Sequence, residues 1–289
     1  MKKVFVLFCL SALAHDVDPQ SPIAELKGNA AAVVLARVSG YSQDGEILLA
    51  IEEHWMGTSS SEIKLSVAAE NTPAYKQGGL FVVFLSKRGH YHPRPLVETH
   101  RIGPAIFRDN PKTRPLLQAA SGLAVPKAAI NKARGEALRG ADPMMQRFAA
   151  LEYKFGEVSA ADAALITAQY KSREEITRGY LLQAASRHPA VFTKTWIREQ
   201  SRAELRPGKV SEPFLLEEAM TMVAYYGKDE DASLAEPYLT HEHYGVFNAT
   251  LTCLMQRDEA KARELAQALL NSEDLPEVRR RSIKYLLFN

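Results

Sequence analysis

The 289-residue sequence has very few cysteines and no long apolar run. Its two cysteines are Cys9 and Cys253, and Cys9 lies in a segment that we expect to be removed, so no disulfide can form within the remaining chain. Cys253 lies in an apolar helical stripe with Val246 and Thr250, which indicates a buried structural thiol rather than a nucleophile. The apolar run Val4–Leu10 is far shorter than the ~20 residues of a membrane span. We therefore expect no transmembrane segment.

Neither sign of charge dominates the chain. Lys and Arg together number 36 against 34 Asp and Glu, for a net charge of +2. Removal of Lys2 and Lys3 with the leader would lower 36 to 34 and balance the two signs. A general attraction to nucleic acid or to acidic lipid is therefore not expected, and we predict no nucleic-acid partner.

The common catalytic signatures are also absent from the sequence. It contains no G-x-S-x-G elbow, no phosphate-binding G-x-x-x-x-G-K-[ST], no dinucleotide-binding glycine fingerprint and no H-E-x-x-H zinc motif. Gly78-Gly79 is typical of a turn, and no carboxylate pair stands out for glycoside cleavage. These absences favour a protein without catalytic activity, and we expect no cofactor.

Residues 1–14 have the three parts of a secretory signal peptide. Lys2 and Lys3 supply the charged start, Val4–Leu10 the apolar core, and Ala12-Leu13-Ala14 the small-residue cleavage site. A short buried strand is the alternative for this segment. The pattern predicts export, and therefore a periplasmic or secreted protein.

The region from residue 22 to residue 107 contains short segments with strand periodicity and no helix between them. These segments end at turn residues such as Ser39-Gly40 and Asp44-Gly45. Strands at this spacing predict a small barrel or sandwich. The expected strands are Ala31–Val38, Glu46–Trp55, Glu62–Val67 and Leu80–Leu85, followed by a weaker pair that reaches Ile106.

The strand order and its turns resemble a domain of exported bacterial proteins. Trp55-Met56-Gly57 at a strand end and Gly78-Gly79 before the strand Leu80–Leu85 carry the resemblance. It implies a five-stranded OB-like barrel, similar to the netrin and tissue-inhibitor-of-metalloproteinase class. Members of the inhibitor class use an N-terminal cysteine and several disulfides, which this chain lacks, so metalloprotease inhibition is not carried over.

Residues 108–140 form an expected connector that is rich in basic side chains. Between Arg108 and Arg139 there are seven Lys or Arg and two acidic residues, which gives 7 − 2 = +5. The connector is either a solvated linker with a surface helix, or a docking site for an acidic partner or anionic lipid headgroups. In the second case Lys127, Lys132 and Arg134 are the candidate binding residues. The absence of interleaved aromatics disfavours single-stranded nucleic acid.

Residues 141–289 show helical periodicity almost throughout. Start signals recur along this region: Asp142-Pro143, a Ser172-x-x-Glu175 capping box, Ser211, Asp258 and Pro276, and a further helix is expected from about Tyr244 to Met255. Gly227 is an expected helix end. Each helix has one apolar stripe, so the helices must pack on one another to bury these stripes.

The helical region also contains a weak internal repeat. Glu175–Leu182 is echoed in Glu277–Leu287, and helix pairs that start near Ser172, Ser211 and His241 are roughly 30 to 40 residues apart. The final segment LPEVRRRSIKYLLF resembles the second helix of a HEAT-type repeat. The resemblance implies HEAT-like helical repeats, with an irregular helical bundle as the alternative. The predicted fold class is therefore α+β, an OB-like barrel followed by HEAT-like repeats.

Three groups of histidines are candidate sites. His90-Tyr91-His92 in a strand would place both imidazoles on one face, a spacing found in zinc and copper sites, with exposed hairpin residues as the alternative. His15 would become the new amino terminus and could join such a site, or be a frayed polar end. His241-Glu242-His243 is interpreted as a helix cap, because residues i and i+2 do not share a helix face.

Two functions follow from these observations. The first is an exported non-enzymatic binding or scaffold protein that acts through protein–protein contacts with another envelope or secreted protein. The alternative is a zinc- or copper-binding protein or metalloenzyme that uses His90 and His92.

Overall fold

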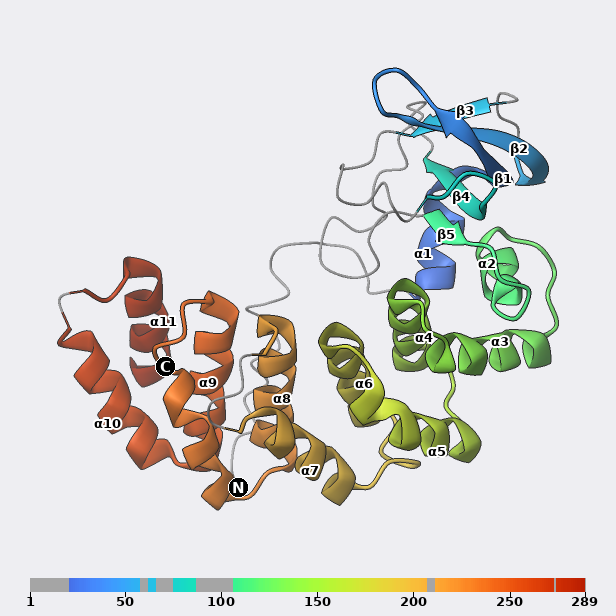
Figure 1. The fold of residues 1–289 in the computed structure, drawn as a ribbon. Helices are drawn as coiled ribbons and strands as arrows, with labels where there is room; N and C mark the ends of the chain where they lie inside the picture. The colour runs from blue at the N-terminus through green and yellow to red at the C-terminus, as the bar shows by residue number, and fades with distance from the viewer. Residues whose placement is uncertain are drawn as a thin grey trace. The chain divides into compact units, whose positions relative to one another are not determined.

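The computed structural model describes residues 21–57, 62–65, 75–86, 106–206, 211–272 and 274–288. The expected leader, residues 1–14, lies outside these ranges. The described chain forms two compact units, the first with residues 21–157 and 164–169 and the second with residues 158–163 and 170–288. Each unit is described by itself (Figure 1).

The first unit contains an antiparallel sheet. Its strands are β1 (Ala30–Tyr41), β2 (Ile47–Met56), β3 (Glu62–Leu65), β4 (Leu80–Ser86) and β5 (Ile106–Arg108). Their spatial order is β3-β2-β1-β4-β5, and the described strands form one open sheet. The expected closed barrel is thus corrected, because the edge strands β3 and β5 pair with β2 and β4 and not with each other.

The apolar run of β1 is buried on both faces of the sheet. Val34 and Val38 belong to a core cluster on one face, together with Leu49 and Val83. On the other face the Phe107 ring makes edge-to-face contacts with Phe84 and Phe148, at centroid distances of 5.9 and 5.8 Å. A strand that is covered on both sides needs continuous rather than alternating hydrophobicity, as the sequence shows here.

The helices of the first unit pack on one another and extend through the expected connector, and one of them meets the sheet through Phe148. They are α1 (Pro22–Asn29), α2 (Arg114–Ala120), α3 (Lys127–Arg139) and α4 (Pro143–Phe155), followed by α5 (Ala160–Gln169), which both units share. The predicted start of α4 is confirmed, since the Asp142 carboxylate accepts the Met144 amide at 3.0 Å. Residues 108–140 are therefore mostly structured, and α3 buries Ala133, Ala137 and Leu138.

The second unit consists of helices that pack on one another. Its elements are η2 (Tyr170–Ser172), α6 (Glu175–Arg187), α7 (Lys194–Glu204), α8 (Pro213–Tyr226), η3 (Asp229–Leu234), η4 (Glu236–Tyr238), α9 (Tyr244–Arg257), α10 (Glu259–Leu270) and α11 (Glu277–Phe288). Helix α8 packs against α6, α7 and α9. Figure 1 shows α6, α8, α9 and α11 in succession, with α7 and α10 beside them. Among the described residues, no helix combines the length and apolar character needed to cross a bilayer.

Contacts between successive helices recur at a nearly constant separation in sequence. Gln183 of α6 donates to Glu218 of α8, 35 residues later, and Tyr244 of α9 bonds Ser282 of α11, 38 residues later. Arg257 of α9 donates to a carbonyl of α8 that lies 34 residues earlier. The unit is therefore repeat-like, because α6, α8, α9 and α11 follow one another at intervals of roughly 30 to 40 residues in the sequence.

Local signals located most of these helices, with two corrections. Helices α9 and α10 begin where expected, and Gly227 ends α8. The expected Ser172 cap is wrong, because the Glu174 side chain accepts the Thr177 amide at 3.0 Å and caps α6. Between α8 and α9 the chain forms the 3-10 segments η3 and η4 instead of a second full helix, and Pro237 removes a backbone donor there.

Candidate functional site

Two of the three candidate basic residues are held by one loop within the first unit. The Nζ of Lys127 lies 2.8 Å from Oε2 of Glu157, and Nη2 of Arg134 donates to the Glu157 carbonyl at 3.0 Å. Residue 157 follows α4, so α3 and the end of α4 meet at this point. Lys132 is exposed on α3 and takes no part in the cluster. The structure therefore brings Lys127 and Arg134 together and leaves Lys132 apart.

The buried position of Arg134 points to a structural role. Only 5% of the residue is exposed, and its guanidinium carbon lies 4.1 Å from the centroid of the Tyr153 ring. Glu152 is buried nearby. Burial raises the pKa of Glu152, while the Ile23 amide, the Ser21 hydroxyl and the charge of Arg134 oppose the rise. Since the Ile23 amide donates to Glu152 at 2.7 Å, this carboxylate ties α1 to α4.

Most other basic residues of the connector also have acidic partners. Arg114 donates from Nε to Oδ1 of Asp109 at 2.8 Å, and Lys112 and Arg139 lie 3.8 and 3.5 Å from Glu136. Asp109 and Glu136, which hold these side chains, are the two acids already counted in the excess of +5, and Glu157 from outside the segment offsets one further charge. Among the three candidates, Lys132 is the best placed to meet a partner.

The candidate metal ligands His90 and His92 lie outside the described residues. Within the described ranges, no group of three or more His, Cys, Asp or Glu side chains is arranged to hold a metal ion. The histidine site therefore stays a prediction from the sequence.

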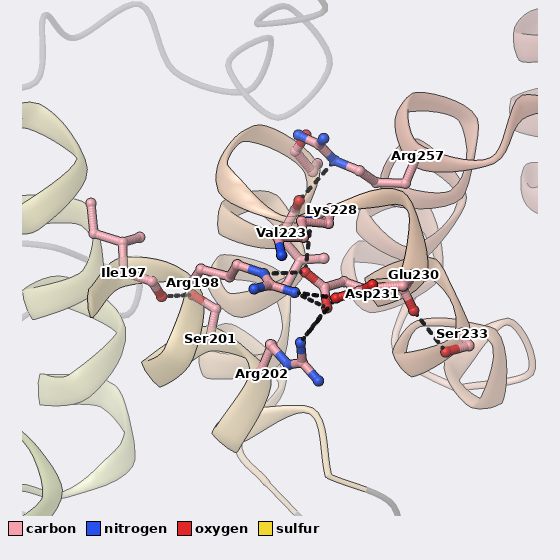
Figure 2. A network of polar contacts seen from close by, with 11 residues as sticks. Ile197, Arg198, Ser201, Arg202, Val223, Lys228, Glu230, Asp231, Ser233 and Arg257 are labelled. Atoms are coloured by element: carbon pink, nitrogen blue, oxygen red, sulfur yellow. Dashed lines mark hydrogen bonds and ion pairs between the residues drawn. The ribbon is translucent and has the colours of Figure 1, made fainter. Parts of the chain in front are cut away.

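The most connected polar cluster of the second unit surrounds Asp231 (Figure 2). Its side chain is completely buried. Oδ2 accepts from Nε of Arg198 at 2.6 Å and from the Lys228 amide at 2.8 Å, and Oδ1 accepts from Arg198 Nη2 at 3.0 Å and lies 2.8 Å from Nη1 of Arg202. The cluster fastens η3 to α7.

The acid–base state of Asp231 follows from these contacts. Burial by itself raises the pKa of the carboxyl, but the hydrogen bonds from Arg198 and the Lys228 amide, with the charge of Arg202, lower it below its usual value. Both carboxylate oxygens already have donors, so Asp231 is unsuited to proton transfer. Glu230 also lies 2.9 Å from Arg198, and two cations therefore face two anions.

A second buried cluster links η2, α6 and α7. The Tyr170 hydroxyl donates to Oε1 of Glu204 at 3.2 Å, and Nε of Arg178 lies 3.0 Å from the same oxygen. Burial, together with the charge of Glu204, raises the pKa of Tyr170 well above its usual value. The phenol therefore stays neutral and serves as a hydrogen-bond donor rather than a base.

The predicted structural role of Cys253 agrees with its position. The residue is fully buried in α9, and burial raises the pKa of its thiol to about 12. A thiol in this state is almost entirely protonated at neutral pH, and it is the thiolate that acts as a nucleophile. Cys253 is therefore a packing residue.

Arginines satisfy the carboxyl ends of several helices in the second unit. Arg257 of α9 donates to the carbonyls of Val223 and Ala224 at the end of α8. Arg280 of α11 donates to the carbonyl of Leu270 at the end of α10 at 2.7 Å, and Arg263 of α10 reaches Leu287 O near the end of α11 at 3.0 Å. These guanidiniums complete the helix ends and are therefore committed to the fold.

The outward side of α8 and α9 remains the best candidate for contact with a partner. We call this surface the layer face. Its side chains are half-buried or exposed and follow one side of each helix at intervals of about one turn. They are Thr221, Tyr225, Asn248, Thr252 and Gln256. Tyr225 is 50% exposed. These five side chains are uncharged and include an accessible aromatic ring, and the acidic residues nearest to them on α8 are the half-buried Glu217 and Glu218, one turn before Thr221.

No family model, curated protein or solved structure matches the chain. Its function is therefore argued from the arrangement of its own residues.

Proposed function

We propose that this chain is an exported, non-enzymatic binding or scaffold protein that contacts another envelope or secreted protein through its helical unit. The observation that carries this proposal is the layer face, an uncharged strip with an exposed tyrosine on consecutive packed helices. Stacked helical repeats present such continuous surfaces to partners. Aromatic side chains are enriched, and Lys and Glu depleted, at the centres of protein interfaces.

The polar clusters support the same function. The buried carboxylates Asp231 and Glu204 each have a cationic partner, and Cys253 is buried and protonated. These three groups stabilise packing, and none of the three is an activated nucleophile or base. The proposal includes an OB-like origin for the sheet, HEAT-type repeats for the helices, and export through the segment 1–14.

Substitutions on the layer face provide the test. Tagged protein purified from its own host's envelope would be compared with a Tyr225→Ser, Thr252→Arg double variant and with a Gln267→Arg control on the exposed side of α10. Bound proteins would be identified by mass spectrometry. We expect one stoichiometric partner with wild type and control, and its loss from the double variant. A partner that binds the double variant equally well would contradict the role of the layer face.

Export can be tested separately. Amino-terminal sequencing of the protein from a periplasmic or culture fraction is expected to start at His15, after cleavage behind Ala14. An uncleaved chain found only in the cytoplasmic fraction would refute export.

A further inference from the structure

Glu217 of α8 reaches across to the start of α9. Its Oε1 lies 3.0 Å from Nδ1 of His243, which precedes α9 and does not cap it with its side chain. A Cβ at Gly245 would lie only 2.0 Å from the same carboxylate oxygen. The Glu217 carboxyl group therefore sits directly against the first turn of α9, in a space that exists because residue 245 is glycine.

The charged groups of the segment before α9 and of α11 either contact other partners or lie exposed. In the segment before α9, the backbone amide of His243 donates to Nδ1 of His241 at 3.1 Å, while Glu242 is exposed. From α11, Arg279 donates to the carbonyls of His241 and Glu242, both at 2.7 Å. The charge nearest to Glu217 is thus that of His243 when its imidazole is protonated.

The other helices that pack on α8 direct their ionisable groups elsewhere. On α6, Arg178 pairs with Glu204, and Glu175 accepts the Glu212 amide at 2.6 Å. On α7, Arg198 and Arg202 pair with Asp231. On α9, Arg257 donates to carbonyls in the last turn of α8. Next to Glu217 on α8 itself, Glu218 accepts a hydrogen bond from Gln183 at 2.5 Å.

Partial burial gives this carboxyl group an unusual affinity for protons. The Glu217 side chain is 30% exposed, and burial raises its pKa from the model-compound value of 4.5 to about 7. The protonated carboxyl group can donate to Nδ1 of His243 and so join α8 to α9.

We propose that Glu217 and His243 form a pH-sensitive latch between α8 and α9: the protonated carboxyl group of Glu217 holds the first turn of α9 against α8, and loss of its proton releases the contact. After deprotonation a carboxylate without a counter-charge faces the backbone of Gly245. Its exposed edge allows the side chain to rotate into water, which separates it from α9. This latch is independent of the proposed partner and would operate in the isolated protein.

The direction of the pH effect follows from proton linkage. In the closed state Glu217 holds its proton up to a pH of about 7, whereas in an open, solvated state it releases it from a pH of about 4.5. Opening is therefore coupled to proton release, so rising pH favours the open state between these two values, and the effect levels off above the upper one. This coupling predicts that opening increases at least about twofold between pH 6 and pH 8.

Hydrogen–deuterium exchange of the full chain would test the latch. After correction for the intrinsic exchange rate, protection of the peptide that contains Tyr244–Phe247 is expected to fall at least about twofold from pH 6 to pH 8 in the wild type. The same peptide of Glu217→Gln, which preserves the side-chain shape but does not titrate, should show equal protection at both values. A peptide from α10 serves as the internal reference.

A control variant and a direct titration of Glu217 provide two further tests of the latch. Glu242→Gln removes an exposed carboxylate from the same segment and should retain the full pH dependence. In the wild type, the carboxyl ¹³C resonance of Glu217 should titrate with a midpoint near pH 7, as burial predicts. A midpoint below about pH 5.5, an unchanged pH dependence in Glu217→Gln, or its loss in Glu242→Gln would each overturn the proposal.

Discussion

Nε of Arg198 lies 2.6 Å from Oδ2 of Asp231, a side chain with no exposed surface, while Nη2 of the same guanidinium lies 2.9 Å from Glu230, which is 65% exposed. One arginine thus joins a buried and a solvated carboxylate that are adjacent in sequence. The two pairs differ mainly in solvent access, so they allow a direct comparison of a buried and a surface ion pair in one fold.

Asp231→Asn is expected to destabilise the helical unit strongly. The substitution leaves Arg198 and Arg202 without their buried counter-charge, and we expect a loss of about 2–4 kcal/mol in the free energy of unfolding. Glu230→Gln removes the solvated pair and should cost less than about 1 kcal/mol. Urea unfolding followed by circular dichroism measures both values. Equal losses for the two variants would contradict a structural role for the buried pair.

Asp231 should also contribute to acid sensitivity. Its folded-state pKa lies below its usual value, so its stabilisation is present above that usual value and is lost as pH falls through the lowered one. Wild-type melting temperature should therefore drop steeply below about pH 4, with a shallower drop in Asp231→Asn. Thermal scans from pH 3 to 7 provide the comparison, and parallel curves would exclude this contribution.

Gly179→Ala should destabilise α6 although alanine is the better helix former. A Cβ at residue 179 would lie 2.6 Å from Cε1 of Phe214, whose ring packs on Tyr180 with centroids 4.8 Å apart. We expect a loss of about 1–3 kcal/mol, because the ring must move. Gly28→Ala in α1 meets no atom within 4 Å and should instead be neutral or stabilising by up to ~1 kcal/mol. Circular-dichroism melting curves would show whether the two substitutions differ in sign.

Cys253 should be unreactive in the folded protein. Burial and the raised pKa of its thiol, about 12, both suppress thiolate formation. In a Cys9→Ser background, a colourimetric disulfide reagent at pH 8 is expected to leave Cys253 unmodified until urea is added. Rapid labelling of native protein would show that α9 opens far more readily than its packing implies.

Substitutions of the candidate basic residues should differ in their effect on stability according to how deeply each residue is buried. Arg134→Glu places a carboxylate against Tyr153 and loses the hydrogen bond to the Glu157 carbonyl, so we expect a loss of more than about 2 kcal/mol in stability. Lys132→Glu changes an exposed side chain and should alter stability by less than about 0.5 kcal/mol. Thermal unfolding distinguishes these outcomes, and only Lys132→Glu would then be informative in a binding assay.

Helix boundaries were the most predictable part of the fold. Asp142-Pro143, Asp258 and Gly227 mark ends through contacts within a few residues, and such contacts are visible in the sequence. The α8 start was harder, because the Glu212 amide there is satisfied by Glu175, 37 residues away in the sequence. A cap supplied by another helix cannot be recognised from the residues around the helix start.

The closure of the sheet and the partners in the polar clusters also depend on residues that are far apart in the sequence. Strand periodicity located β1, β2 and β4, but closure depends on whether the first and last strands of the order pair, which is a long-range property. In the connector, the partner of Lys127 is Glu157, which lies outside the segment and 30 residues away in the sequence. Asp231 belongs to the acidic run Asp229–Asp231, and nothing near it in the sequence identifies Arg198 as its partner.

The arginine contacts at the helix ends limit how the helical unit can be divided. A fragment that stops after α8 would lose Arg257 and leave the carbonyls of Val223 and Ala224 without their donor. One that stops after α10 would lose Arg280 and with it the donor for Leu270 O. Helices α8 and α10 are thus each completed by a later helix, so the repeats are not interchangeable modules. Truncation from the carboxyl end should progressively unravel the helices that remain.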